Sequence, residues 1–267
     1  MSNAFELAEQ AAKAIREKSG IQSHEIVLCI GSGWLKTLSG KIVWSIDASE
    51  IPGFRAAEVD GFSSEISTIQ LDSGKHVLVL PRTHLYQGYG VEAVAHPART
   101  AAAIGAKIMV LTNGAGGLNP EWKPGQVFLI SDHINLTATS PIEGAKFVDL
   151  TDMYSPRLRA IAKRIDPSLE EVIYAQFRGP HYETPAEVAM VGKIGGHMVG
   201  MSTALEAIAA REVGLEVLAL SMQTNPAAGV VPGGVSHEHV LAAGKAGEHH
   251  NSELLAVLCE ALSNELE

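Results

Sequence analysis

Apolar residues recur along this chain in two patterns, one typical of helices and one typical of strands. Helical spacing predicts helices over residues 5–15, 91–106, 156–164, 185–194, 203–213 and 236–262. Runs rich in β-branched and other apolar residues predict strands over 26–30, 66–71, 76–80, 107–111, 126–130, 172–177, 198–200 and 215–222. Strands that alternate with helices indicate an α/β fold with a mostly parallel, mixed sheet. The 66–71 and 76–80 strands form a hairpin across residues 72–75.

Two predicted helices begin with a capping box. Thr184 is followed by Pro185 at the first helical position and by Glu187 three residues after the cap, and Thr203 is followed by Glu206 in the same way. The chain shows no internal repeat, no low-complexity tract and no convincing linker. We therefore expect one domain over residues 1–267.

Composition narrows the class of protein. A formal net charge of −10 argues against general nucleic-acid binding, which needs a basic face. No apolar run approaches the roughly 20 residues that span a bilayer, so we expect no membrane partner. The N-terminus lacks the apolar core of a signal peptide. The only two cysteines, Cys29 and Cys259, lie in apolar elements as buried residues would, and we expect a cytoplasmic protein.

Polar or glycine-rich segments follow directly after six of the predicted strands. Because parallel strands end at one edge of a sheet, these segments can converge on one pocket. The first segment, Gly31-Ser32-Gly33, is not a dinucleotide fingerprint, since Lys36 stands where the third glycine belongs, and no P-loop follows. The segments are residues 31–33, 81–84, 113–117, 182–183, 201–202 and 224–225.

Several of these segments suit an anion. Arg82 offers a planar fork of donors that fits phosphate, and His84 falls on the same face if the strand continues. Ser32, the backbone near Gly114 and Ser202 at a helix N-terminus add further donors. Ordinary turn geometry, or a surface position for Arg82, would also account for each of these residues.

Two other residues suit a flat heterocycle. Glu183 precedes the Thr184 cap but is not needed for it, and Asn225 can both donate and accept. Together they could read the N–H and C=O edges of a base. Stabilisation of Glu183 by the helix dipole and turn formation at Asn225-Pro226 are the structural alternatives.

The eleven histidines do not form a recognisable metal motif. Leu241 stands where His-Glu-x-x-His needs its second histidine, and His237 and His239 do not face each other on a helix. We therefore expect no metal.

Taken in order, these motifs resemble the trimeric, 6-oxopurine-preferring purine nucleoside phosphorylase family over nearly the whole chain. The combination is specific, although each motif alone is not. The motifs are Gly31-Ser32-Gly33, residues 82–89, residues 112–120, residues 131–136, residues 179–187, residues 199–203 and Thr224-Asn225.

The resemblance implies a mixed central sheet that closes into a distorted β-barrel flanked by helices, and a homotrimer. It implies reversible phosphorolysis of inosine, guanosine and their 2′-deoxy forms to a free base and a (deoxy)ribose 1-phosphate. No cofactor is implied, because inorganic phosphate is a co-substrate. The implied catalytic residues are Asn225, Glu183 and His84. Phosphate would contact Ser32, Arg82, His84, Gly114 and Ser202; ribose would contact Tyr86, Met201 and His237; the purine would contact Tyr182, Glu183, Val199 and Asn225; and Phe147 would reach a neighbouring subunit's site.

The sequence departs from the family pattern in four places. Val59-Asp60-Gly61-Phe62 replaces the usual Val-Pro-Gly-His of a phosphate-gating loop, so the gate histidine is absent. Trp34-Leu35 replaces Leu-Gly after the first glycine motif. Tyr182 and Pro226 stand where animal members commonly have Phe and Lys.

Three alternatives remain open at this point. A methylthioadenosine phosphorylase usually has Asp where Asn225 stands, so Glu183 with Asn225 argues against it. A non-catalytic nucleoside-binding protein would bind without turnover. A nucleoside hydrolase would release the base without phosphate.

Overall fold

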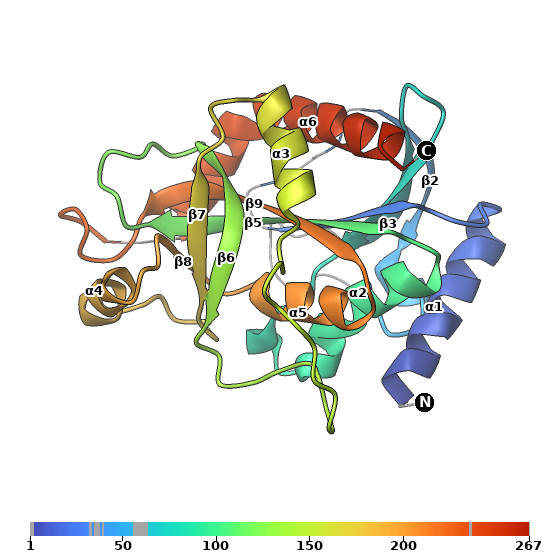
Figure 1. Ribbon diagram of the computed structural model, residues 1–267, viewed down its shortest axis with the longest axis horizontal. Helices are drawn as coiled ribbons and strands as arrows, with labels where there is room; N and C mark the ends of the chain where they lie inside the picture. The colour runs from blue at the N-terminus through green and yellow to red at the C-terminus, as the bar shows by residue number, and fades with distance from the viewer. Residues whose placement is uncertain are drawn as a thin grey trace.

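A nine-stranded mixed sheet with helices on both faces makes up the part of the chain that the computed structural model describes (Figure 1). The described residues are 3–31, 34, 38, 40–55, 64–234 and 237–266, without the side chains of 237–241, 244, 246 and 248. The strands are β1 (Ile26–Ile30), β2 (Lys41–Asp47), β3 (Glu65–Gln70), β4 (His76–Pro81), β5 (Ile108–Gly117), β6 (Val127–Asn135), β7 (Glu171–Gln176), β8 (Met198–Gly200) and β9 (Glu216–Pro226). The α-helices are α1 (Asn3–Ser19), α2 (Val91–Ala103), α3 (Pro156–Ile165), α4 (Pro185–Lys193), α5 (Ala204–Glu212) and α6 (His237–Asn264), with short 3₁₀ turns η1 (Ala48–Glu50) and η2 (Leu85–Gln87).

The sheet closes on itself at one end. Its strand order is β2-β3-β4-β1-β5-β8-β7-β6-β9, and β5 pairs with β9 as well. The five strands β5, β8, β7, β6 and β9 therefore form a closed barrel, while β2, β3, β4 and β1 extend from it as an open sheet. This confirms the predicted α/β fold with a mixed sheet and a barrel.

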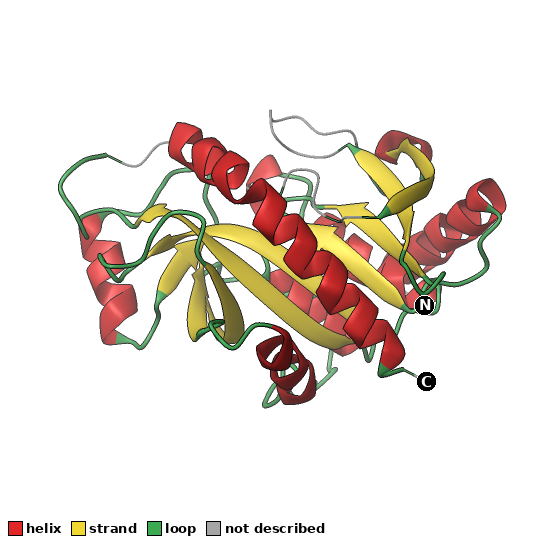
Figure 2. Cartoon of the chain, turned by 90° about the horizontal axis from the view of Figure 1, so that it is seen from above, coloured by secondary structure: helices red, strands yellow, loops and turns green. Residues whose placement is uncertain are grey.

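Alternation along the central strands divides the core into two layers. In β1, Val27 and Cys29 pack with α1, α2 and α5, whereas Ile26 and Leu28 pack with α3 and α6. Figures 1 and 2 show the same arrangement, with α6 lying across one face of the sheet and α2 and α5 beneath the other. Both faces of the central strands are thus buried, which explains their continuous apolar runs.

Local signals set the ends of two helices as predicted. At α4, the Thr184 hydroxyl accepts a bond from the Glu187 N–H at 3.2 Å, and Glu187 accepts one from the Thr184 N–H at 2.7 Å. At α5, the Thr203 N–H donates to Glu206 Oε2 at 2.8 Å. Both capping boxes place a loop residue that we predicted to bind ligand immediately before the helix.

Four strands differ from the sequence prediction. β5 runs through the glycines to Gly117, β6 runs to Asn135 and β9 runs to Pro226, so the predicted turns at 112–117 and 224–226 are strand. Pairing around the barrel holds these polar and glycine-rich residues extended, and no local pattern reveals it. The prediction also missed β2, whose exposed, edge position gives it little apolar character.

Two further findings concern exposure. Cys29 and Cys259 are free and fully buried, as predicted. Among the helices of the described chain, none combines the length and the apolar character that crossing a bilayer requires.

Candidate active site

Arg82 follows the end of β4 and is buried, which rules out the surface alternative. β4 ends at Pro81, so the strand does not continue through Arg82 and His84 and alternation cannot place them on one face, yet both side chains are buried. Arg82 Nε donates to both Glu206 oxygens, at 2.9 and 2.8 Å, and Nη1 donates to the Thr112 carbonyl at 2.5 Å. Its Nη2 is buried and has no hydrogen-bond partner among the described residues. One donor of a fixed guanidinium is therefore available for an anion.

Burial opposes the positive charge of Arg82. The adjacent Glu206 carboxylate outweighs this effect and holds the pKa of Arg82 above its usual value. The guanidinium is consequently a permanent, fixed cation at the edge of the sheet.

Gly31, directly after β1, makes room for Arg82. A Cβ at this position would lie 2.1 Å from Arg82 Nη1 and 2.3 Å from the Thr112 carbonyl oxygen. Nearby, Trp34 is buried and donates from Nε1 to the Asn113 carbonyl at 2.8 Å. The unusual tryptophan thus ties the segment after β1 to β5, beside the close approach that Gly31 permits. Ser32 itself lies outside the described residues, as does the segment 56–63 that contains the altered gating loop.

His84 caps η2 and stacks on Tyr86. The two ring centroids are 4.8 Å apart with 20° between the ring planes, and the His84 N–H donates to Gln87 Oε1 at 2.7 Å. Burial, aided by the charge of Arg82, lowers the pKa of His84 to about 3. His84 is therefore neutral near pH 7 and can donate one hydrogen bond without adding charge.

The turn before α5 carries Ser202, another of the residues predicted to bind an anion. Ser202 is buried, its N–H donates to the Tyr174 hydroxyl at 3.2 Å, and its own hydroxyl lies 3.3 Å from that of Thr203. Thr203 has φ 84°, a conformation that costs a non-glycine residue about 1–3 kcal/mol. The Asn113 amide and Glu206 hold Thr203 in place. These two bonds hold the turn that carries Ser202 directly before the N-terminus of α5.

Glu183, directly before the Thr184 cap of α4, is a second buried charged residue with an atom that lacks a partner among the described residues. It is 8% exposed, and its Oε1 is buried with no hydrogen-bond partner within the described chain. Burial raises its pKa above the usual value. A buried acceptor without a partner is rare in folded proteins, and this oxygen is suited to a ligand that brings an N–H group.

Asn225 and Val199 flank Gly116. Gly116 of β5 pairs with Val199 of β8 on one side and with Asn225 of β9 on the other. The β5–β9 register shifts between Ala115 and Gly116, so Thr224 is an extra residue that re-aims Asn225. The side-chain oxygen Oδ1 of Asn225 accepts from the Thr224 hydroxyl at 2.7 Å, and one N–H of its side-chain amide (Nδ2) donates to the Pro226 backbone carbonyl at 2.8 Å. The second amide N–H is thereby oriented as a donor.

Tyr86 and Met201 meet at Gly179. A Cβ on Gly179 would lie 2.4 Å from Met201 Sδ and 3.2 Å from Tyr86 Cδ1. The structure thus brings together two of the three predicted ribose contacts, and the side chain of the third, His237, lies outside the described residues.

Tyr174 links the two ends. Burial raises the pKa of the Tyr174 hydroxyl, and the charges of Arg82 and Glu183 shift it in opposite directions. Both charged groups therefore lie within electrostatic reach of this one fully buried side chain. The Tyr86 hydroxyl, whose pKa burial raises, is affected in turn by Arg82 and by Tyr182, which is 39% exposed. The predicted residues accordingly gather around one region between η2, the residues after β7 and the residues after β8.

Two of the predicted site residues, Gly114 and Phe147, do not lie with the others between η2 and the residues after β7 and β8. Gly114 is half-buried inside β5, opposite Met222 of β9. Phe147 is 98% exposed, so it contacts no site within its own chain. That exposure is what a residue lent to another subunit would show.

Sequence reasoning missed two residues that organise the site. It found Glu206 only as a helix cap, and it treated Tyr174 only as part of a strand. The burial of Glu206 and its pairing with Arg82, 124 positions away, leave no local trace. Within the described chain, no three His, Cys, Asp or Glu residues are grouped as metal ligands.

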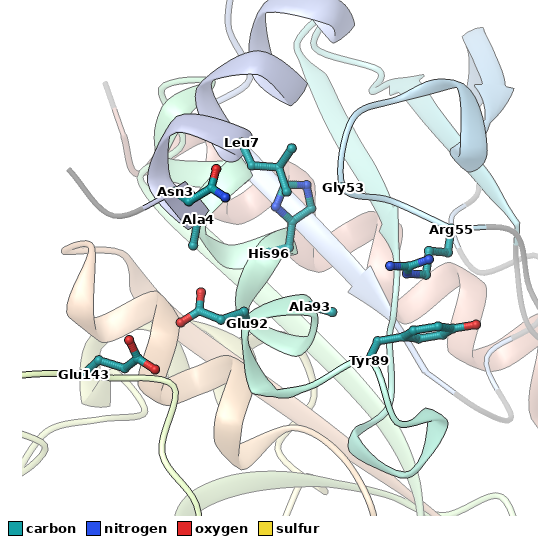
Figure 3. A pocket seen from close by; sticks show the side chains of 10 residues that line it. All are labelled: Asn3, Ala4, Leu7, Gly53, Arg55, Tyr89, Glu92, Ala93, His96 and Glu143. Atoms are coloured by element: carbon teal, nitrogen blue, oxygen red, sulfur yellow. The ribbon is translucent and has the colours of Figure 1, made fainter.

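A separate cavity of about 440 Å³ lies between α1 and α2. Figure 3 shows Arg55 against Tyr89 at one end, with the guanidinium carbon 4.0 Å from the ring centre, and Glu143 at the other. None of the predicted site residues lines this cavity, so it is distinct from the candidate active site.

Comparison with known proteins gives consistent matches over nearly the whole chain. Residues 25–261 match the phosphorylase superfamily. A protein from Cellulomonas named purine nucleoside phosphorylase is 54% identical over 94% of this chain and 92% of its own length. One of the same name from Mycobacterium tuberculosis is 47% identical, with 94% of each chain covered. The crystal structure of Schistosoma mansoni purine nucleoside phosphorylase in complex with inosine is 30% identical, with a TM-score of 0.84 and 96% of each chain covered.

Proposed function

Because this chain belongs to the phosphorylase superfamily, and within it to the purine nucleoside phosphorylases, we propose that it cleaves 6-oxopurine nucleosides with inorganic phosphate. The products are the free base and ribose 1-phosphate, or deoxyribose 1-phosphate from a 2′-deoxynucleoside. One observation supports this most strongly. A guanidinium nitrogen of Arg82 and a carboxylate oxygen of Glu183 are both buried without a partner among the described residues, and both charges act on the hydroxyl of Tyr174.

The Arg82 end suits the nucleophile. Phosphate would accept from Arg82 Nη2, from neutral His84 and from the Ser202 hydroxyl at the α5 N-terminus. Ser32 and the Gly114 N–H are the remaining proposed donors. Because Arg82 and Ser202 are fixed by bonds to Glu206 and Tyr174, little reorganisation is needed when the anion binds.

The Glu183 end suits the leaving group. Glycosidic bond cleavage leaves positive charge on ribose and negative charge on the purine. The free N–H of Asn225 can donate to N7 of the departing purine, and Glu183 can accept from the purine's N1–H. Preorganised donors of this kind typically contribute about 3–4 kcal/mol each in the transition state. Tyr182 and Val199 would pack against the ring.

The sugar is proposed to lie between these ends. Tyr86 and Met201, which meet at Gly179, would contact the ribose together with His237. In this arrangement the phosphate, which stabilises the developing ribosyl cation, attacks from the side opposite the purine. The separation also keeps the phosphate charge away from Glu183, where repulsion in a buried site would be strong.

The subunit arrangement is part of the proposal. We infer a homotrimer in which the exposed Phe147 of one chain covers the nucleoside in the next. The chain would act as a single domain and without a cofactor. Two free, buried cysteines are compatible with a reducing compartment such as the cytoplasm.

The decisive experiment measures base release from inosine, guanosine and adenosine with and without phosphate. We expect hypoxanthine and guanine only when phosphate is present, with ribose 1-phosphate detected in equal amount by ³¹P NMR, and little adenine. Base release without phosphate would indicate a hydrolase. Nucleoside binding by calorimetry without turnover would indicate a binding protein, and a preference for adenosine would point to a 6-aminopurine phosphorylase.

A further inference from the structure

Glu206 is buried at the centre of the anion-binding end but has no place in the proposed reaction. Its side chain and that of Arg82 are each 1% exposed. Both oxygens accept from Arg82 Nε; Oε1 also accepts from Cys29 Sγ at 3.2 Å, and Oε2 also accepts from the Thr203 N–H at 2.8 Å. A capping glutamate needs only the last of these bonds. The other contacts join the cap to β1 and to the residue after β4.

The first consequence concerns Arg82. Its Nε is held by Glu206 and its Nη1 by the Thr112 carbonyl, so the plane of the guanidinium is fixed and Nη2 is the donor left over. A buried guanidinium without a counter-ion would be drawn toward water, because desolvation penalises its charge. Glu206 lowers the net charge near the phosphate, yet it keeps Arg82 in the site.

The second consequence concerns the turn before α5. The same carboxylate accepts the Thr203 N–H and so helps to hold Thr203 at φ 84°. Ser202 precedes Thr203, and its hydroxyl lies 3.3 Å from the Thr203 hydroxyl. Movement of Glu206 would therefore displace the Ser202 donor and the Arg82 donor together.

We propose that Glu206 is a positioning residue that aligns the Arg82 guanidinium and the Ser202–Thr203 turn on the phosphate co-substrate. This inference rests on the proposed function, since it assigns a residue to that reaction's phosphate site. Glu206 touches no substrate; it acts through the two groups that do. This role predicts that a change at Glu206 weakens the binding of phosphate but not of the nucleoside, because neither Arg82 nor Ser202 contacts the purine.

The test compares Glu206→Gln with Glu212→Gln. Glutamine has almost the same shape, but it is uncharged and its NH₂ group cannot accept, so Arg82 loses its counter-ion and its Nε–H faces a second donor at one of the two oxygen positions. We expect the KM for phosphate to rise by about tenfold to a hundredfold, the range typical of outer-shell partners of a bound ion, while the KM for inosine stays within about twofold. Glu212 is a matched control in α5, with a 4% exposed side chain paired to Arg99 3.3 Å away. Its change should reduce stability without affecting the phosphate KM.

A second variant distinguishes the effect of the position of the Glu206 carboxylate from the effect of its negative charge. Glu206→Asp keeps the carboxylate but shortens its reach, so we expect the phosphate KM to rise here as well, whereas a purely electrostatic role would leave it unchanged. A phosphate KM within twofold of the parent in both variants, or a parallel rise for inosine, would overturn the inference. Failure of both variants to fold would also overturn it, since Glu206 would then be required by the fold. Phosphate-dependent turnover by the unmodified protein tests the proposed function independently.

Discussion

Replacing Gly31 with alanine tests whether close approach of the backbone to Arg82 controls phosphate binding. The added Cβ would lie 2.1 Å from Arg82 Nη1 and 2.3 Å from the Thr112 carbonyl oxygen. Favourable contacts need about 3.5–4 Å, so the neighbours must move by more than about 1 Å. Thr112 lies in β5, which pairs with β9 at this position, and cannot easily yield. The Arg82 guanidinium must therefore swing away and break its bond to Thr112, and the backbone at residue 31 must also move away from the Thr112 carbonyl oxygen.

The size of the effect follows from these two changes. Overpacking costs about 1–3 kcal/mol, and loss of a hydrogen bond from a charged donor costs about 1.5–3 kcal/mol. The two are coupled and do not simply add, so we expect the free energy of unfolding to fall by about 3 kcal/mol. This corresponds to a decrease in Tm of about 6–12 °C for a chain of this size. Displacement of Arg82 should also raise the phosphate KM by at least about tenfold.

Thermal unfolding with and without phosphate, followed by phosphate titration at saturating inosine, measures both effects. Gly192→Ala is a suitable control. Gly192 lies in α4, and an added Cβ would contact Leu118 at an ordinary distance of 3.4 Å. Alanine there should stabilise the helix by at most about 1 kcal/mol. A Gly31→Ala protein whose Tm lies within about 2 °C of the parent and whose phosphate KM is unchanged would refute the reasoning.

Three further predictions concern the base, the neighbouring subunit and pH. Asn225→Asp should raise the ratio of kcat/KM for adenosine over inosine by about tenfold or more, since an acceptor replaces the amide donor; an unchanged ratio would show that Asn225 does not read the purine. Phe147→Ala should raise the nucleoside KM but not the phosphate KM, with a change in unfolding free energy within about 0.5 kcal/mol because the side chain is 98% exposed; an unaltered inosine KM would contradict its role. Burial lowers the pKa of His24 to about 4, so between pH 6.5 and 4 the unfolded chain binds a proton that the folded chain does not. Stability should therefore decline as pH falls through this window, by up to about 1.4 kcal/mol per pH unit, and His24→Gln should flatten the slope in denaturant titrations; an equal slope would exclude His24 as the cause.

Local patterns in the sequence account for much of the fold. The two capping boxes at Thr184 and Thr203 need only residues three positions apart, and the apolar runs reflect burial on both faces of the sheet. Pro185 at the first turn of α4 adds a third local cue. These features could be predicted because neighbouring residues alone determine them.

The residues of the candidate site could be predicted from the sequence, but the residues that hold them in place could not. Polar residues after strands indicated the convergence of Arg82, Ser202 and Glu183. The partners that orient them, Glu206 and Tyr174, are distant in sequence and read as a cap and a strand residue. Pairing between distant segments also extends β5 and β9 beyond their apolar runs and creates the irregularity at Thr224. Such long-range pairing has no periodic signature in the chain.

The double pairing of Gly116 has a consequence for how this protein can change in length. Val199 and Asn225 pair with the same glycine from two strands. The directions of their side chains therefore depend on the register of both the β5–β8 and the β5–β9 pairs. Inserting or deleting a single residue within β9 would exchange the inward and outward sides of every position beyond it. Asn225 would then point to the opposite face of β9 even with all other residues intact. Insertions and deletions are therefore tolerable in the loops, such as the exposed stretch 231–234, and not in the strands of the barrel.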